Sequence, residues 1–308
     1  MPQIISAIDI GSNAIRMIVA EITVNQVKIL KKFRAPVRLG KDAFMNGEIS
    51  EDSIEDAKEA FEKFSQINRK FKVDTCRAVA TSAVRESKNK EQFIKTIFEH
   101  SKIKIELIDG VEEARLIHLA VKKEIDLDQK KIMLIDVGGG SVEVTFSEKN
   151  QILATKSFPM GTVRILDILN KRKMHETQLN VIMGEFLEPL SKHIHSQTDH
   201  SRLDFAVGTG GNLECMGRLK VQLLRKTPNT FVTLQELGEI IQKLKSYTVK
   251  ERIVRLDLKP DRADVILPAC LLIQTIMRQA EVEKIMIPCV GLRDGILWSG
   301  LNPTRTGS

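Results

Sequence analysis

The sequence predicts an α/β protein of two related domains that face one cleft, and three observations carry this prediction. The first is a short phrase that occurs twice, over Ile8–Asn13 (IDIGSN) and over Ile135–Ser141 (IDVGGGS). The second is the alternation of apolar strands and amphipathic helices that follows each copy. The third is the length of 308 residues, which is typical of about two domains.

Each copy of the phrase is an apolar strand that ends in Asp, followed by one spacer and a turn of Gly and Ser. A second apolar stretch follows directly, over residues 15–22 and 142–146. This order predicts a β-hairpin with a carboxylate at its mouth. Glycine lets a backbone approach a ligand closely, and successive N–H groups in such a turn form an anion site. A carboxylate beside an anion site would repel phosphate unless it holds a hard cation that bridges to the phosphate oxygens. The pattern therefore favours phosphate chemistry. A single copy would more commonly be a plain turn.

The first half predicts the order β-β-β-α-β-α-β-α. Runs of β-branched and apolar residues indicate strands, and apolar residues at helical spacing after an acidic first turn indicate helices. The expected strands cover residues 3–10, 15–23, 26–35, 75–80 and 103–108, and the expected helices cover 50–69, 91–99 and 111–123. A polar turn or helix start is expected over Thr81–Arg85.

The pattern then restarts. Strands are expected over residues 131–136, 141–148, 151–158, 203–208 and 284–287. Helices are expected over residues 162–170, 175–194, 233–245, 249–255, 260–279 and from about 292, with one more opened by Gly208–Asn212. Charge is dense and apolar residues are few over 122–130, so we predict domains over 1–123 and 124–308, with the last helix able to pack back on the first domain.

The amino-acid composition limits the kinds of partner that we expect the protein to bind. The net charge is +7, from 47 basic and 40 acidic residues, with no basic tail and only one Trp and one Tyr. Aromatic platforms for stacking bases are therefore scarce. The basic balance favours attraction of a small polyanionic substrate over binding of a nucleic-acid duplex. An ordinary basic surface remains the alternative interpretation.

The cysteines and the apolar runs indicate a cytoplasmic protein without a membrane partner. Cys76, Cys215, Cys270 and Cys289 form no close pair, which is typical of buried, reduced thiols in an intracellular protein. The N-terminus has no basic region of the kind that opens a secretory signal. The longest uncharged run, residues 265–277, is too short to cross a bilayer and predicts a buried helix.

Glu112 and Glu113 fall in the first turn of a predicted helix, just after Asp109. Acidic residues there commonly complement the helix dipole. This helix, however, begins at the end of a strand, the edge where open α/β sheets bind ligands. Apolar residues at 114, 117 and 121 would bury one helix face and leave a carboxylate directed at the cleft.

Other polar groups follow predicted strands. Arg85 suits phosphate because its guanidinium donates two parallel hydrogen bonds, although a solvated surface arginine is the alternative. Asp136 and Glu143 flank one hairpin turn and could reach one ion; their oxygen donors favour Mg²⁺, Mn²⁺ or Ca²⁺ over Zn²⁺. The segment Gly208–Asn212 could bind phosphate at a helix N-terminus or form an ordinary turn. Met160–Arg164 is a weaker candidate of the same kind. No histidine has a partner at metal-ligand spacing.

Together these residues resemble the exopolyphosphatase and guanosine pentaphosphate phosphohydrolase family in its short two-domain form. This family lies within the superfamily of acetate and sugar kinases, heat-shock chaperones and actin. The resemblance runs from Ile8 to about Trp298, over Ile8–Asn13, Ala80–Arg85, Glu112–Arg115, Ile135–Glu143, Met160–Arg164, Gly208–Gly211, Arg262–Asp264 and Gly291–Gly295. The hairpins alone would indicate only the superfamily, whereas Glu112–Arg115 and the Arg85 motif are specific to the family.

The resemblance implies two ribonuclease-H-like (actin-like ATPase) domains with an interdomain cleft. It implies that Glu113 is the base that activates water. It implies that Asp136 and Glu143 hold a divalent ion, most simply Mg²⁺, with Asp9 as a further candidate ligand. The groups implied to bind phosphate are Gly11, Ser12, Asn13, Arg85, Gly138, Gly139, Gly140, Ser141, Gly208, Gly210, Gly211 and Asn212. Ala14 stands where many members have Ser, which removes one hydroxyl.

The activity implied by the resemblance is hydrolysis of the terminal phosphoanhydride of inorganic polyphosphate with release of orthophosphate. Hydrolysis of guanosine pentaphosphate to guanosine tetraphosphate is the alternative, because both substrates present the same terminal anhydride. A small-molecule kinase and a non-catalytic sensor of guanosine tetraphosphate also stay open. The expected partners are thus polyphosphate or a guanosine polyphosphate, and a homodimer is left open.

Overall fold

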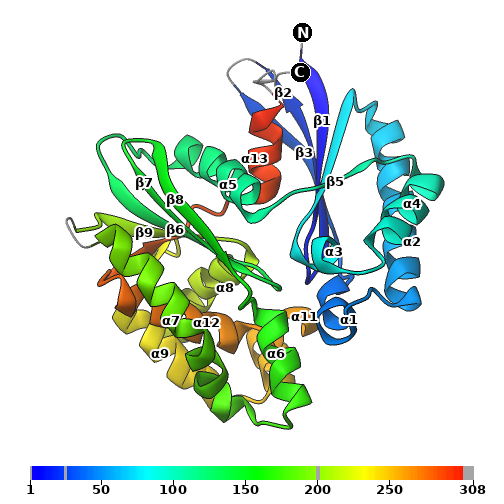
Figure 1. Ribbon diagram of the computed structural model, residues 1–308. Coiled ribbons are helices and arrows are strands. Elements are labelled where there is room, and N and C mark those ends of the chain that lie inside the picture. The colour runs from blue at the N-terminus through cyan, green and yellow to red at the C-terminus, as the bar shows by residue number, and fades with distance from the viewer. Residues whose placement is uncertain (1, 24–25, 199–201, 301–308) are drawn as a thin grey trace. The chain divides into compact units, whose positions relative to one another are not determined.

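The computed structural model describes residues 2–23, 26–198 and 202–300 (Figure 1). The chain separates into two compact units, which are described one at a time. The first unit comprises residues 1–120 and 291–308, and the second comprises 121–290. Each unit is built around one mixed β-sheet with helices, so the prediction of an α/β fold with two sheets is confirmed. The division at residue 123 and the cleft stay predictions, and the last helix, α13, belongs to the first unit.

The sheet of the first unit has the strand order β3-β2-β1-β4-β5. Its strands are β1 (Gln3–Ile10), β2 (Ile15–Ile22), β3 (Val27–Ala35), β4 (Thr75–Ala80) and β5 (Ile105–Leu107). The pairs β1–β2 and β2–β3 are antiparallel, and the pairs β1–β4 and β4–β5 are parallel. The central strand β1 is buried over its last six positions, which explains its nearly continuous apolar sequence.

Six helices of the described residues belong wholly or mainly to the first unit. They are α1 (Leu39–Asn46), α2 (Glu51–Phe71), α3 (Ser82–Glu86), α4 (Lys90–Ser101), α5 (Gly110–Glu124) and α13 (Leu292–Ser299). The N-cap of α2 is Ser50, whose hydroxyl accepts from the N–H of Ser53 at 3.3 Å. The helix then buries Phe61 and Phe64. α2 and α4 lie side by side (Figure 1), and α13 packs against β1 and β2.

α1 was not predicted from the sequence. This helix has only eight residues, includes Gly40, and lacks a side-chain cap at its N-terminus. Each of these properties weakens the local helical signal. Gly40 is nevertheless required, because a Cβ atom there would lie 2.9 Å from Cβ of Ser12. The helix is therefore stabilised by close packing on the β1–β2 turn rather than by its own sequence.

The sheet of the second unit has the order β10-β11-β9-β6-β7-β8. Its strands are β6 (Lys131–Val137), β7 (Val142–Glu148), β8 (Gln151–Phe158), β9 (Phe205–Thr209), β10 (Phe231–Thr233) and β11 (Lys284–Met286). As in the first unit, the third, second, first and fourth strands lie in that order, with antiparallel pairs followed by a parallel pair. The duplicated phrase thus reflects a duplicated strand order. The short edge strand β10 was not predicted.

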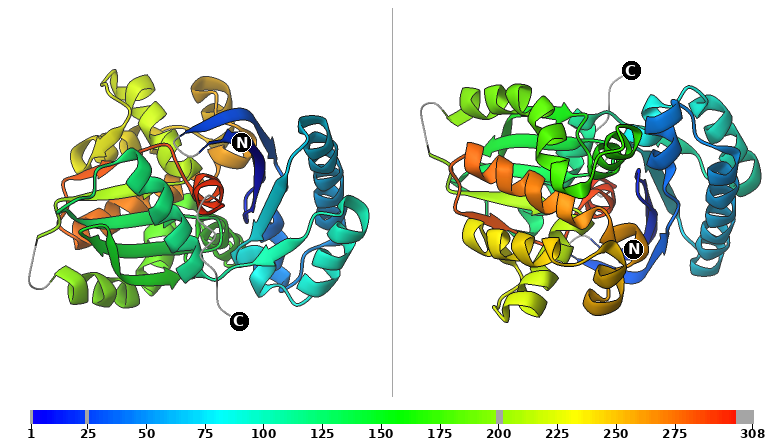
Figure 2. Two further views of the ribbon diagram at one scale, coloured as in Figure 1. Left: turned by 90° about the horizontal axis from the view of Figure 1, so that it is seen from above. Right: turned by 90° about the horizontal axis from the view of Figure 1, so that it is seen from below.

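The helices of the second unit are α6 (Thr162–Lys171), α7 (Leu179–Thr198), α8 (Gly211–Leu219), α9 (Leu234–Lys245), α10 (Val249–Leu256), α11 (Pro260–Ala263) and α12 (Ile266–Gln279). A 3-10 turn over Glu176–Gln178 precedes α7, and a π-helical segment over Lys220–Leu224 extends α8. The long α12 packs against both α7 and α9, and Figure 2 shows it in orange between them.

The helix predicted over residues 260–279 is wrong in one respect, because it breaks between α11 and α12. Pro268 explains the break. Proline has no N–H, and its ring clashes with the carbonyl of the residue four positions earlier, here Asp264. α12 therefore starts at Ile266, where Pro268 falls in the first turn and needs no hydrogen bond.

None of the four cysteines, all of which lie in the described residues, forms a disulfide. Cys215 and Cys270 are buried, and burial raises the pKa of both thiols, that of Cys270 well above its ordinary value. Cys289 is exposed and Cys76 is only half-buried, so the prediction that all four cysteines are buried is wrong for Cys289 and holds only in part for Cys76. Among the described residues, no helix is both long and apolar enough to cross a membrane.

A buried arginine fastens the helices of the second unit to one another. Arg252 of α10 is 0% exposed and donates to both carboxylate oxygens of Glu176, at 2.7 and 2.8 Å. It also donates to the carbonyl of Leu244 at 3.0 Å and to that of Ala263 at 3.3 Å. One side chain thus joins the turn before α7 to the end of α9 and to α11.

We expect Arg252→Ala to lower the free energy of unfolding by about 3 kcal/mol, because it breaks a buried ion pair and leaves buried carbonyls without a donor. Arg255→Ala on the same helix is the matched control. Arg255 is paired with Glu251 at the surface, so its loss is expected to cost below about 1 kcal/mol. Urea denaturation measures both variants. Equal losses would contradict the anchoring role of Arg252.

Candidate active site

The glycine turn of the first unit connects β1 and β2. Because β1 and β4 are parallel neighbours, their carboxyl ends meet at one sheet edge. The hydroxyl of Ser12, in this turn, lies 3.1 Å from that of Ser82, at the start of α3. Arg38 donates from Nε to Oδ1 of Asn13 at 2.8 Å. Strand pairing therefore brings two of the sequence motifs of the first unit together.

Asp9 is buried at the end of β1 and faces Arg16 on β2, its direct partner across the hairpin. Their side chains approach to 3.5 Å. Burial raises the pKa of Asp9, whereas the charges of Arg16 and Arg293 act to lower it. A carboxylate that is neutralised by its own cross-strand neighbour has less need of a cation. A metal role for Asp9 stays a prediction, and it is the weakest of the three candidate ligands.

Arg85 lies in α3 and is held by backbone. Its Nη1 donates to the carbonyl of Ile108 at 2.7 Å, and the N–H of Ile108 in turn donates to the carbonyl of Ala80 at 3.1 Å. Ile108 directly follows the last residue of β5 and lies two residues before α5 begins. The guanidinium is thus fixed at the edge of the sheet from which the Glu112–Glu113 pair emerges.

The first turn of α5 carries both glutamates. The Asp109 side chain caps the helix by accepting from the N–H of Glu112 at 2.8 Å. Ala114 and Ile117 are buried, as their spacing predicts, and Glu113 is itself only 7% exposed. The carboxylate predicted to act as the base is therefore held within the protein and not in bulk solvent.

Glu112 has a different role from its neighbour. It accepts from Arg115 at 2.6 and 2.9 Å and lies 3.5 Å from Arg77. The hydrogen bond from Arg115 is the main reason that the pKa of Glu112 is lowered, and Arg77 adds to it. Arg77 also donates to both oxygens of Glu106, at 3.0 and 3.1 Å, and to Ser299 of α13 at 2.9 Å. Glu112 thus anchors the helix start.

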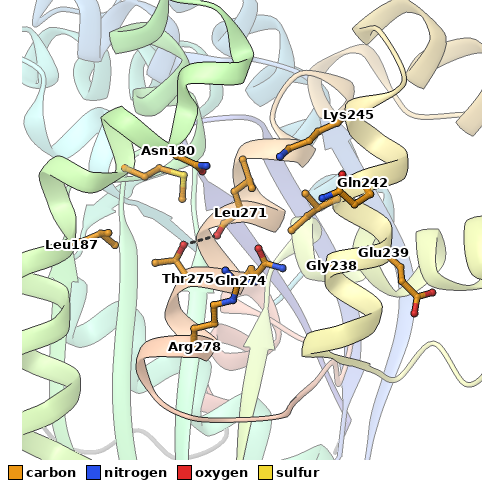
Figure 3. A pocket seen from close by; sticks show the side chains of 12 residues that line it. Asn180, Leu187, Gly238, Glu239, Gln242, Lys245, Leu271, Gln274, Thr275 and Arg278 are labelled. Atoms are coloured by element: carbon orange, nitrogen blue, oxygen red, sulfur yellow. Dashed lines mark hydrogen bonds between the residues drawn. The ribbon is translucent and has the colours of Figure 1, made fainter.

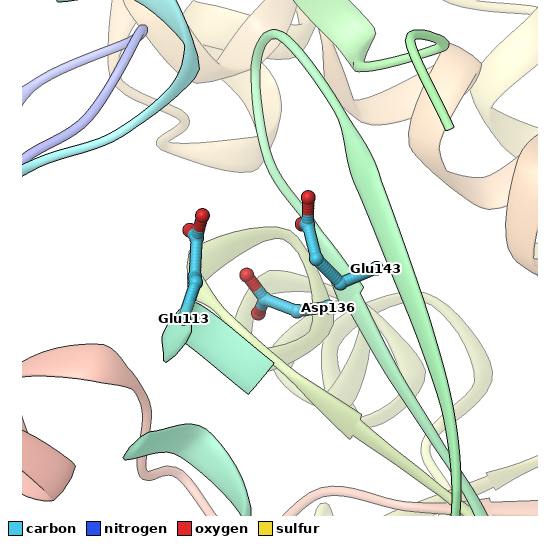
Figure 4. A group of neighbouring side chains, drawn as sticks. All are labelled: Glu113, Asp136 and Glu143. Atoms are coloured by element: carbon cyan, nitrogen blue, oxygen red, sulfur yellow. The ribbon is translucent and has the colours of Figure 1, made fainter. Parts of the chain in front are cut away.

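In the second unit, four side chains form one row across neighbouring strands, which we call the carboxylate row: Thr209, Asp136, Glu143 and Ser157. Asp136 and Glu143 are direct partners of β6 and β7, and Figure 4 shows their side chains next to each other. Thr209 of β9 donates to Asp136 Oδ1 at 2.6 Å. Ser157 of β8 donates to Glu143 Oε1 at 2.7 Å.

The row offers only oxygen atoms, from two carboxylates and two hydroxyls. Such a donor set fits a hard cation such as Mg²⁺, Mn²⁺ or Ca²⁺ and disfavours Zn²⁺. The hydroxyls fix the orientation of each carboxylate, as partners one step removed from a metal commonly do. Asp136 and Glu143 were predicted together, and the strand register brings them together. Thr209 and Ser157 were missed.

The glycine turn Gly138–Ser141 is fastened to the start of α6. N–H groups of residues 161, 162 and 163 donate to the carbonyls of 140, 138 and 139 at 3.2, 3.1 and 2.9 Å. In a trans peptide the carbonyl and the next N–H point in opposite directions. The N–H groups of 139, 140 and 141 therefore point away from α6, and in the described parts of the chain none of them has an acceptor. Such an arrangement could bind an anion, and the phosphate contacts of this turn stay a prediction.

Glycine occupies three positions near the carboxylate row, and the structural reason differs at each position. A Cβ atom on Gly161 would lie 2.4 Å from the backbone of Gly139, so this glycine lets α6 approach the turn. Gly210 has φ +86°, and a Cβ atom there would lie 3.0 Å from Asp136 Oδ1. A Cβ atom on Gly208 would lie 2.7 Å from the Leu213 side chain. Gly208 is thus needed for packing, and its phosphate contact stays a prediction.

Asn212, at the start of α8, has a structural task in the site. Its Nδ2 donates to the carbonyl of Val137 at 3.4 Å, and its Oδ1 accepts a hydrogen bond from Arg262 of α11. It thereby links the end of β6 to α11. The predicted contacts of Gly11, Ser12, Asn13, Gly210, Gly211 and Asn212 with phosphate are not tested by these hydrogen bonds.

The family assignment follows from comparison with known proteins. A model of the Ppx/GppA phosphatase family matches residues 18–303, nearly the whole chain. The chain belongs to the Ppx/GppA phosphatase family. This membership confirms the resemblance based on the sequence motifs.

Similar solved structures agree with this family. An exopolyphosphatase from Cytophaga hutchinsonii is 28% identical, with a TM-score of 0.89 over 99% of this chain and 100% of that chain. The Aquifex aeolicus PPX-GPPA enzyme is 25% identical, with a TM-score of 0.79 over 97% of this chain and 100% of that chain. A bifunctional 3-dehydroquinate synthase/phosphatase from Fusobacterium nucleatum is 29% identical over 287 residues. The match covers 88% of this chain but only 43% of that relative, so the chain spans less than half of its length.

The Arg77 contacts predict that the loss of this arginine loosens the first turn of α5. Arg77→Ala removes the link between β4 and the start of α5, so we expect faster hydrogen exchange at the first-turn amides. We expect kcat for phosphate release to fall about tenfold with little change in KM. This loss is smaller than the roughly 10²-fold that a 1 Å misplacement of a catalytic group can cost. Arg77→Lys keeps the charge without the planar fork and should restore part of the activity.

Hydrogen exchange and phosphate release together test this positioning role. Arg69→Ala, a change of the same kind on the exposed side of α2, serves as the control. If Arg77→Ala exchanges and turns over like the wild type, Arg77 does not position α5.

Proposed function

We propose that this protein hydrolyses the terminal phosphoanhydride of inorganic polyphosphate and releases orthophosphate, in a reaction that depends on a divalent cation. The observation that carries the proposal is the carboxylate row beside a glycine turn whose N–H groups point away from α6. The family and the similarity to an exopolyphosphatase support it. Because the curated relative is more than twice as long, substrate and partners are proposals throughout.

Asp136 and Glu143 would hold the cation, with Thr209 and Ser157 fixing their orientation. When bound, the cation neutralises oxygens of the transferred phosphoryl group. Mg²⁺ is the first choice because it commonly binds through few carboxylates together with substrate phosphates.

Glu113 is the general base in this proposal. Its carboxylate would accept a proton from the attacking water, which requires a group within hydrogen-bond reach of that water. Its burial and its place in the first turn of α5, four residues after the cap Asp109 and directly after the anchor Glu112, keep the side chain in a restricted volume. Positioning of this kind supplies much of the catalysis in phosphoryl transfer, where little covalent help is needed.

The remaining groups would bind phosphate oxygens. In the second unit these are the N–H groups of the Gly138–Ser141 turn. In the first unit they are Arg85 and the polar groups of the Gly11–Asn13 turn, which Ser82 and Arg38 support. An anhydride chain carries several charges, so a set of distributed donors suits it better than one strong cation.

Glu113→Gln tests the base. It keeps size and hydrogen bonding but cannot accept a proton from water, so we expect phosphate release to fall by about 10²–10⁴-fold. Glu112→Gln is a matched neighbour, and because Glu112 anchors Arg115 and Arg77, we expect a smaller loss. A melting curve of each variant checks folding. Turnover near the wild-type value in folded Glu113→Gln would refute the role of Glu113.

A panel of substrates tests the reaction. Long polyphosphate, short polyphosphate, guanosine pentaphosphate and ATP are compared with Mg²⁺ and with a chelator. We expect orthophosphate release from polyphosphate, and this release should stop when the cation is chelated. Asp136→Asn should need at least about tenfold more Mg²⁺ for half-maximal release, because even the loss of a hydrogen-bond partner of a metal ligand lowers metal affinity by about 10–100-fold. Release that persists in chelator contradicts the metal site. ATP consumption that requires an added acceptor would instead indicate a kinase.

A further inference from the structure

A pocket lies within the second unit, away from the strands that form the carboxylate row. It is lined by α7, α9 and α12, and its volume is about 650 Å³. We call it the three-helix groove (Figure 3). Its residues recur three or four positions apart on each helix, as they must on one helix face. They include Asn180, Met183 and Leu187 of α7, Gly238, Ile241, Gln242 and Lys245 of α9, and Leu271, Gln274, Thr275 and Arg278 of α12.

The floor of the groove is apolar. Met183, Ile241 and Leu271 are 2%, 2% and 7% exposed. Gly238 of α9 contributes no side chain and so keeps the groove open opposite Gln274. A Cβ atom at Gly238 would lie 3.5 Å from Gln274 Nε2, an ordinary contact. Packing of the helices therefore does not demand a glycine in the middle of α9, where glycine costs helix stability.

The rim of the groove is cationic. Lys245 and Arg278 line it from two different helices, and neither forms an ion pair with a described residue. Glu239 is the one carboxylate of the lining, and its oxygens bind Lys226 at 3.2 and 3.3 Å. Figure 3 shows the Glu239 side chain directed away from the groove and that of Lys245 directed over it. The lining thus carries two positive charges that no carboxylate offsets.

We propose that the three-helix groove binds a small organic anion with an apolar body. The volume lies within the range of about 300–1,000 Å³ that small-molecule sites occupy. The apolar floor would cover the body of the ligand, and Lys245 and Arg278 would bind its acidic group. The amides of Asn180, Gln242 and Gln274 can donate or accept hydrogen bonds. The proposal does not depend on the phosphatase mechanism, because no residue of the carboxylate row or of α5 lines the groove.

The probe for the test is 8-anilinonaphthalene-1-sulfonate, which joins an apolar ring system to one anionic group and becomes fluorescent away from water. We expect saturable binding of one probe per chain to the native protein. The double variant Lys245→Gln/Arg278→Gln should weaken binding at least tenfold. Lys243→Gln/Lys250→Gln changes the net charge equally outside the groove and should leave binding unchanged. Equal affinities in the two double variants overturn the proposal.

Steric variants separate the groove from other apolar surface. Gly238→Leu places a side chain in the groove and should abolish the one-to-one binding, and Gly238→Ala should weaken it while adding only an ordinary contact. Gly184→Leu on α7 adds the same group where no atom lies within 4 Å and serves as the control. Melting curves and phosphate release should match the wild type for the folded variants. Unchanged probe binding in Gly238→Ala and Gly238→Leu overturns the proposal.

A comparison of two probes tests whether the ligand of the groove must carry a negative charge. N-phenyl-1-naphthylamine has the same ring system without the sulfonate. It should bind the wild type at least tenfold more weakly than the anionic probe. Equal affinities of the two probes would show that the cations of the rim do not select the ligand, and this overturns the assignment to an anion.

Discussion

The candidate site residues of the second unit depend on one constraint, the pairing of β6 with β7. It sets Asp136 directly opposite Glu143, and like charges in that position destabilise a sheet because their Cβ atoms are only about 5 Å apart. Thr209 and Ser157 offset part of this repulsion by donating to one oxygen of each carboxylate. A row that places two acids together between two donors is poorly explained by stability alone, and the proposed cation would account for it.

The chemical groups in both units are held by residues that need not touch a substrate. In the second unit, N–H groups at the N-terminus of α6 donate to the carbonyls of the glycine turn. The N–H groups of the turn therefore point away from α6. In the first unit Arg77 and Arg115 hold Glu112, and so fix the first turn of α5 that carries Glu113. Rigid placement of this kind is what phosphoryl transfer requires of a protein.

Most strands and long helices could be predicted, because periodicity and caps are local properties. The exceptions have local causes as well. α1 and β10 are too short and too weakly patterned to stand out, and Pro268 ends one predicted helix early. Ser157 was beyond prediction for another reason. Counting back from the β7–β8 turn would pair Glu143 with Lys156, but the register shifts between Phe146 and Ser147, so Ser157 becomes the partner.

The sequence by itself determined the duplicated hairpin, the α/β class, the family and the acidic residues at the strand ends, because each is written in neighbouring residues or in their spacing. Only the tertiary structure decided that Thr209 lies beside Asp136, that Arg77 holds Glu112, and that three helices leave an apolar groove with a cationic rim. These contacts join segments far apart in the chain. Parallel pairing and helix packing bring such segments together without leaving any periodic signal in the residues between them.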